Sequence, residues 1–272
     1  MTVRRAWWKT GLGLVFTALM LFPVYWMLNV SFTKTSDLRL SPPHLFPVDP
    51  TLEGYTAVLG QQLPNLGTSL LIGLGCVALT VVIAAPAAYA IALLNLRGGR
   101  TLNFVLLVAQ MIPAVVMAMG FYAIYARAGL LNSVPGLILA DSTVAVPFAV
   151  LLFTAFMGGL PRELLQAARI DGAGAWRTFV SVVLPLSRNS VLTVALFAFL
   201  WAWSDFIFAS TLARNSALKP ITLGIYSYIG NNTTQWNAIM ATAAVASIPA
   251  AILLVVAQRY VAAGVTAGAV KD

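Results

Sequence analysis

The chain has 272 residues, of which 60% are hydrophobic and 9% are charged. Soluble domains carry about 25% charged residues, so this composition excludes an ordinary water-soluble domain, and the abundance of apolar surface excludes disorder. The formal net charge of +8 indicates either nucleic-acid binding or a membrane orientation signal, depending on where the cations lie. The single cysteine, Cys76, excludes an intramolecular disulfide and lies in an apolar stretch, where a buried position is expected.

Long uncharged stretches separate the few charged residues. A helix that rises ~1.5 Å per residue needs about 20 residues to cross a ~30 Å hydrocarbon core, and each stretch holds one such helix. The first stretch is too long for a signal peptide, and no Ala-x-Ala site follows it, so a retained helix is expected. The sequence therefore predicts an all-α membrane protein, with residues 1–272 forming a single domain with six transmembrane helices. The expected spans are 11–32, 68–95, 103–126, 136–157, 190–212 and 238–260.

The distribution of cations predicts the orientation of these spans. If the N-terminus is cytoplasmic, most Lys and Arg residues fall inside, as the positive-inside bias requires. The outer side then receives Lys34, Arg39, Arg127, Arg214 and Lys219, together with the acids Asp37, Asp49, Glu53 and Asp141. We therefore expect a multi-pass protein of a bacterial or archaeal plasma membrane (the inner membrane where there are two), with membrane lipid around it and both termini in the cytoplasm. Nucleic-acid binding is not expected.

Two outer segments differ in character. Residues 33–66 are rich in proline and too polar to span, so we expect them to lie on the membrane surface. Residues 213–237 carry amides and a tryptophan, including Asn231, Asn232 and Trp236. Such groups suit a sugar or a partner surface, but Asn and Thr clusters also occur in any exposed turn.

The inner connection at 158–189 is much longer than a turn requires. Its apolar residues recur at helical spacing between polar ones. Asp171-Gly172-Ala173 is expected to divide it into two short helices, and Leu184-Pro185 to end the second, because proline cannot continue a helix interior. This amphipathic pair either packs on its own bundle or on lipid headgroups, or docks a soluble partner.

Motifs for catalysis are missing from the sequence. It contains neither a phosphate-binding Gly-x-x-x-x-Gly-Lys-[Ser/Thr] loop nor a Gly-x-Ser-x-Gly nucleophile turn. The single histidine, His44, lies in a proline-rich segment and gives no metal site. An intramembrane enzyme would need paired acids or a Ser/His couple, and Asp205 is the one candidate that we take from the spans, so the chain alone is not expected to be an enzyme.

One inner segment carries a recognisable pattern. Gln166-Ala167-Ala168, then Gly172, Val182 and Leu184-Pro185 follow at the spacing of the "EAA" loop of permease subunits in binding-protein-dependent ABC importers. The order Arg169-Ile170-Asp171-Gly172-Ala173 is similar to carbohydrate members. Further agreement across residues 11–272 lies in Asn65–Leu70, Gln110-Met111-Ile112-Pro113, Trp203-Ser204-Asp205-Phe206, Gln258-Arg259-Tyr260 and Gly264–Lys271. The chain thus resembles maltose-permease G-type subunits.

The resemblance implies a type I ABC importer permease fold, with a cytoplasmic coupling loop at 161–187. It implies four partner subunits: a homologous second permease, two ATP-binding subunits and an extracytoplasmic sugar-binding protein. No cofactor is expected on this chain; ATP and Mg²⁺ would bind the partner ATPases. Gln166 departs from the family's Glu, which removes a charge that Glu163 could supply one helical turn earlier.

The resemblance also implies roles for individual residues. ATPase coupling is expected from Glu163, Gln166, Ala167, Ala168, Asp171, Gly172, Ala173, Leu184 and Pro185. A C-terminal ATPase contact is expected from Thr266, Gly268 and Lys271. The substrate path or gate is expected at Gln110, Pro113, Trp203 and Asp205, although Asp205 could instead be a structural residue near the outer interface. A loop that enters the binding protein is expected at Tyr228, Gly230, Asn231, Asn232 and Trp236.

Two alternatives stay open. One is an ABC permease for another small solute such as glycerol phosphate, which a cationic residue lining the path would favour. The other is a secondary transporter, for which several intramembrane ionisable groups or broken helices are expected. The sequence does not reveal which sugar is carried.

Overall fold

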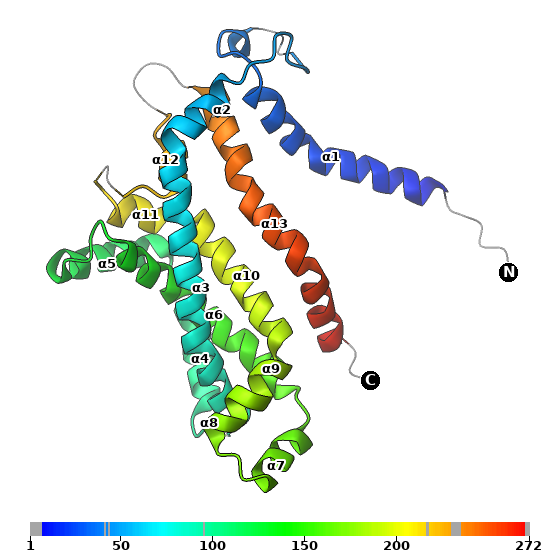
Figure 1. Cartoon of the computed structure of the whole chain (residues 1–272), viewed down its shortest axis with the longest axis vertical. Helices are drawn as coiled ribbons and strands as arrows, with labels where there is room; N and C mark the ends of the chain where they lie inside the picture. Colours follow the sequence, from blue (N-terminus) through cyan, green and yellow to red (C-terminus); the bar gives the residue numbers. More distant parts are fainter. Residues whose placement is uncertain are drawn as a thin grey trace. The chain divides into compact units, whose positions relative to one another are not determined.

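The computed structural model describes residues 7–40, 42, 44–94, 96–215, 218–229 and 235–269, with side chains up to Gln258. Regular structure in these ranges is entirely helical. The chain divides into two compact units: Met1–Pro64 with Gly224–Ile248 (unit 1), and Asn65–Leu223 with Pro249–Asp272 (unit 2). Their boundaries fall inside three helices that Figure 1 labels: α3 (Leu63–Ala92), α12 (Ile221–Tyr226) and α13 (Trp236–Ala269).

Four helical stretches are long and apolar enough to cross a membrane: α1 (Trp7–Ser31), the continuous helix Glu53–Ala92, α6 (Val134–Gly158) and Trp236–Gln258 within α13. Two further spans are broken by bends of 95° and 78°. If each bent pair counts as one span, the described residues contain the expected six.

Unit 1 begins with α1 and a folded segment that returns to the end of that helix. The segment contains the short 3-10 helix η1 (Asp37–Arg39), and the Thr51 N–H donates to the carbonyl of Phe32 at 2.9 Å. Helix then starts at Glu53 and continues through α2 (Glu53–Ala57) and the π-helix η2 (Val58–Gln62) into α3. The expectation that all of 33–66 lies on the membrane surface is therefore wrong for its second half. Pro64 follows closely after η2 in this continuous helix. Because proline has no N–H to donate to the preceding turn, the π-helical turn before it is where the chain departs from regular α-helix.

Unit 1 also contains the start of α13, which packs closely against α2. A Cβ added to Gly54 would lie 2.7 Å from the backbone oxygen of Asn237, so only glycine allows this approach. The short helix α12 (Ile221–Tyr226) precedes this part of the chain.

The core of unit 2 is formed by α3, α6 and α10 (Arg188–Ser204). Ala84 and Ala88, one helical turn apart, are fully buried, because small side chains let membrane helices approach closely. Phe153 and Met157 of α6 fill the space that they leave. Cys76 is buried, as expected, and the Ser142 hydroxyl lies 3.6 Å from its sulfur.

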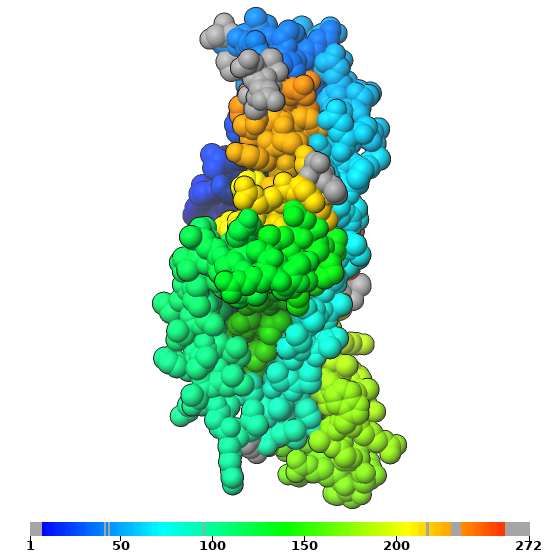
Figure 2. Space-filling model, turned by 90° about the vertical axis from the view of Figure 1, so that its left-hand side faces the viewer, coloured from blue at the N-terminus to red at the C-terminus, as the bar shows by residue number. Residues whose placement is uncertain are grey.

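The expected single span at 103–126 is instead a bent pair, α4 (Gly99–Ala109) and α5 (Ala114–Ala128), which meet at 95°. Pro113 causes the break, because its extended backbone (φ −60°, ψ 135°) caps α5 and cannot continue α4. In Figure 2 α5 (green) forms a ridge, with a hollow beneath it between α3 (cyan) and α4 (teal). The expected span 190–212 is divided in a similar way, since α10 ends at Ser204 and α11 covers Ile207–Leu212.

The inner connection forms a helical segment at the end of unit 2 remote from α5 and α11 (Figure 1). It comprises α7 (Arg162–Ile170), α8 (Ala175–Thr178), the π-helix η3 (Phe179–Val183) and α9 (Leu184–Leu186). The second helix ends at Leu186, one residue beyond Leu184-Pro185 and thus where it was expected to end, and the 78° bend follows.

Candidate functional site

The end of α7 is a hydrogen-bonded turn that depends on Gly172. Gly172 has φ +76°, in the left-handed region. Its N–H donates to the carbonyl of Arg169 at 3.0 Å, and the N–H of Ala173 donates to the carbonyl of Ala168 at 2.9 Å. These two bonds form a Schellman motif. Because other residues pay about 1–2 kcal/mol in this conformation, glycine allows α7 to stop here and the chain to turn into α8.

The second half of this segment is anchored in the core of unit 2. Phe179 and Val183 are 4% and 0% exposed and pack with Phe153 of α6. The ring of Tyr89, on α3, lies 5.2 Å from that of Phe179, and its hydroxyl donates to the carbonyl of Ala175 at 3.2 Å. A displacement of α8 would therefore be transmitted directly to α3 and α6.

The face of the same segment that is not packed on the bundle carries exposed apolar side chains. Leu164, Ile170 and Trp176 are 41%, 85% and 70% exposed. Ala168 is buried, and Ala173 and Leu184 are half-buried. The other residues that the sequence assigned to coupling are exposed: Glu163, Gln166, Ala167, Asp171, Gly172 and Pro185. We call residues 162–186 the coupling segment.

A cavity of about 260 Å³ in unit 2 lies beside the break between α4 and α5. Gln110, which ends α4, is its polar side chain, and the aromatic rings of Phe148 and Phe197 meet edge-on at 5.4 Å in its lining. The full lining is Gln110, Val144, Ala145, Phe148, Phe197, Ala198 and Trp201. One amide among aromatic and aliphatic walls is the usual composition of a small-molecule pocket. The family resemblance selected Gln110 for the substrate path, but the sequence did not single out Phe148 and Phe197, which no local motif distinguishes from other apolar residues of their spans.

Asp205 caps a helix. Its Oδ1 accepts hydrogen bonds from the N–H groups of Ile207 and Phe208, both at 3.1 Å, and its Oδ2 accepts from Ala209 at 2.9 Å. These are backbone donors at the start of α11, where a helix leaves N–H groups without intrahelical partners. This geometry favours the structural alternative for Asp205. Trp203 is also buried, at 7% exposed, and its ring stacks on Phe199 at 5.3 Å.

Asp141 was placed in an outer polar segment by the sequence analysis, and this is wrong. It lies inside α6 and is 1% exposed, and its Oδ1 accepts no hydrogen bond from the described residues. The expected span 136–157 already included Asp141, so the sequence itself indicated that this residue lies within a membrane helix.

The residues assigned to the binding-protein loop separate into three groups. Tyr228 is buried at 8% exposed, in a small cluster with Ala238 and Ile239, so it supports the segment from inside. Trp236 begins α13 and is half-exposed. Gly230, Asn231 and Asn232 lie outside the described residues.

The C-terminal candidates are described only in part. The backbone of Thr266 and Gly268 continues α13, and Lys271 lies outside the described residues. The described ranges hold no group of three or more His, Cys, Asp or Glu side chains that could bind a metal.

Residues 81–267 match the family described as "Binding-protein-dependent transport system inner membrane component". This chain belongs to that family. Members are transport permeases, and the apolar helices and the family together make the chain a multi-pass membrane protein and a transport component rather than an enzyme. The matched region includes the coupling segment, every residue that lines the Gln110 cavity, and Asp205.

Individual relatives of this permease cover nearly its whole length. It is 34% identical over 253 residues to the sulfoquinovosyl glycerol transport system permease protein SmoH of Agrobacterium fabrum, which covers 92% of this chain and 89% of the relative. It is 32% identical to the trehalose transport system permease protein SugB of Mycobacterium tuberculosis, over 100% of both chains. A solved bacterial ABC transporter that imports the acidic polysaccharide alginate matches with a TM-score of 0.80 at 20% identity, over 93% of this chain and 94% of that one. This last match shows the fold, that of a type I ABC importer permease.

Proposed function

We propose that this permease is one half of the translocation pathway of an ATP-driven sugar importer. A homologous second permease would supply the other half, an extracytoplasmic binding protein would deliver the sugar, and two ATPase subunits would dock on the inner side. The substrate class is supported by the relatives, whose names specify sulfoquinovosyl glycerol, trehalose, and trehalose with maltose.

The observation that carries this proposal is the two-sided construction of the coupling segment. Exposed apolar side chains such as Ile170 and Trp176 lie on one side, while Phe179 and Val183 are fixed in the core on the other. A soluble subunit that covers the exposed side would move α3 and α6 with it. For ATP to drive the change, the ATP-bound ATPase dimer must favour one permease conformation by several kcal/mol, since a ligand that binds both states equally shifts nothing. The exposed carboxylate of Glu163 and the amide of Gln166 would supply polar contacts, with the C-terminal residues Thr266, Gly268 and Lys271 as a second contact.

The second permease is supported by α1. Its most apolar stretch of 18 residues has no buried position within the chain. Such a helix must be covered by lipid or by another membrane helix, and a partner permease is the cover that we propose. The orientation with both termini in the cytoplasm belongs to the same proposal, since it places the coupling segment inside.

The sugar path would include the cavity beside Gln110. An amide that can both donate and accept, beside the rings of Phe148 and Trp201, suits a polyhydroxylated ring with apolar C–H faces. Pro113 would hold the α4–α5 bend that opens this cavity, and Trp203 and Asp205 would stabilise the neighbouring helices. The loop with Gly230, Asn231, Asn232 and Trp236, supported by Tyr228, would meet the binding protein.

Reconstitution of the complete importer tests the proposal. The permease would be purified with its second permease, ATPases and candidate binding proteins, and ATPase activity and uptake would be measured over a panel of mono- and disaccharides. We expect one sugar with its binding protein to stimulate both activities. Uptake by this chain alone, driven by an ion gradient, would contradict the proposal.

A further inference from the structure

A second cavity, of about 300 Å³, lies in unit 1 where α1 ends. This volume is at the lower end of the roughly 300–1,000 Å³ typical of small-molecule pockets. Two tryptophans, Trp26 and Trp236, contribute to its walls, and Asn29, Asp37 and His44 contribute polar groups. The complete lining is Trp26, Asn29, Val30, Thr33, Asp37, Leu38, His44, Trp236 and Met240. None of these residues was assigned to the translocation path.

The side-chain oxygen of Asn29, Oδ1, has no hydrogen-bond partner among the described residues. The side chain is 6% exposed, and its Nδ2 donates to the backbone carbonyl of His44 at 3.2 Å, which fixes the orientation of the amide. Its Oδ1 is buried and accepts no hydrogen bond from the described residues. A buried acceptor without a partner costs about 1–3 kcal/mol, so a donor to this oxygen is expected from outside the described residues.

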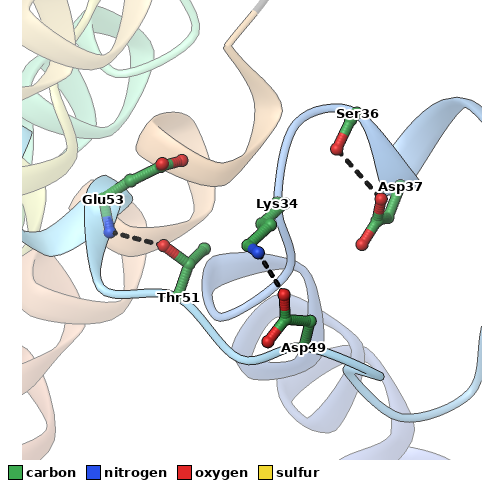
Figure 3. Close-up of polar contacts among 6 residues, drawn as sticks. All are labelled: Lys34, Ser36, Asp37, Asp49, Thr51 and Glu53. Atoms are coloured by element: carbon green, nitrogen blue, oxygen red, sulfur yellow. Dashed lines mark hydrogen bonds and ion pairs between the residues drawn. The ribbon is translucent and has the colours of Figure 1, made fainter.

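The segments that form the cavity walls are fixed by hydrogen bonds and an ion pair between residues that do not themselves line the cavity. The Tyr25 hydroxyl donates to the carbonyl of Leu45, and the Thr35 hydroxyl donates to Asn237 Oδ1 at 3.0 Å. Lys34 pairs with Asp49, as Figure 3 shows, and fastens the returning segment to the end of α1. A cavity fixed in this way is pre-organised, which lowers the entropy lost when a ligand binds.

The chemistry of the lining selects the ligand. The oxygens of Asn29 and Asp37 are acceptors, so the ligand must present donors, and indole surfaces pack well against apolar C–H faces. A pyranose ring has both features, with hydroxyl donors around its edge and C–H groups on its faces. We propose that this cavity is a binding site for a neutral sugar of about one ring, separate from the translocation path.

The proposal can be tested on the full chain in lipid nanodiscs. D-glucose and D-galactose would be titrated by saturation-transfer NMR, with ethanolamine as a cationic competitor. We expect saturable binding of at least one sugar, weakened about three- to tenfold by Asn29→Ala, as the loss of one neutral hydrogen bond implies. Trp236→Ala should weaken binding similarly. Because Trp236 is half-exposed, this variant decides the question if Asn29→Ala does not fold.

Two matched variants serve as controls. Trp7→Ala removes an exposed tryptophan from the same helix α1, outside the cavity, and should not change binding. Gln110→Ala alters the cavity of the proposed sugar path and measures how much of the sugar signal comes from that site. The proposal is overturned if neither sugar binds saturably, if both cavity variants bind like wild type, if only Gln110→Ala weakens binding, or if ethanolamine displaces the sugar. Each of these results leaves the proposed transport function intact, since uptake by the reconstituted importer tests that function separately.

Discussion

The turn at Gly172 offers the sharpest test of the coupling segment. Gly172 is held at φ +76°, but a Cβ added there would meet no atom within 4 Å. The expected cost of Gly172→Val is therefore backbone strain alone, with no steric clash. Left-handed backbone costs other residues about 1–2 kcal/mol, which corresponds to a factor of roughly 5–30 in the population of the native turn. The helices of the bundle do not contact this position, so membrane insertion should be unaffected.

The assay compares transport with ATP hydrolysis in the reconstituted importer. We expect Gly172→Val to reduce uptake by about the same factor, roughly 5–30, while basal ATPase activity and the amount of permease in the membrane stay near wild type. Gly174→Val is the matched control, because Gly174 has φ −67° and an added Cβ there also meets no atom within 4 Å. Unchanged uptake in Gly172→Val, or an equal loss in Gly174→Val, would refute the reasoning.

Three further predictions concern stability and ionisation. Asp205→Ala should destabilise the detergent-solubilised chain by about 0.5–2 kcal/mol through loss of the α11 cap. Asp205→Asn keeps an acceptor oxygen and should lose less stability. Equal melting temperatures for both variants and wild type would contradict the capping role. Gly54→Ala should cost about 1–3 kcal/mol by overpacking against the first turn of α13, whereas Gly60→Ala, where an added Cβ meets nothing within 4 Å, should melt no lower than wild type. The hydrogen bond and charge of Asp49 raise the pKa of Lys34 above 10.5, so the pair stabilises the fold below pH 10.5 and loses this effect as pH rises through the raised value. Asp49→Asn should lower the pKa of Lys34, as measured by ¹³C NMR of methylated lysines with Lys9 as the reference signal.

The chain's own pattern was sufficient for the membrane class, the helical fold and the turn at Gly172 that ends α7. These features depend on local properties: uninterrupted apolar runs, amphipathic spacing and a glycine that terminates α7. The family resemblance selected Gln110, which lines a cavity, and the apolar neighbourhood of Cys76 predicted its burial. Local properties did not separate a straight span from a bent one, and so the 95° break at Pro113 was not expected.

Only the tertiary structure decided how polar groups inside the bundle are satisfied. Asp205 was ambiguous in the sequence, and its role as a cap became visible from three backbone N–H groups of α11. Asp141 was assigned to an outer segment when the charges were divided between the two sides of the membrane, yet it is buried in α6. The unit 1 cavity combines residues of α1, the returning segment and α13. Two of them, Trp26 and Trp236, are about 200 positions apart in the sequence. A sequence shows which groups are costly to bury, but their partners are set by contacts between distant segments, and these exist only once the chain has folded.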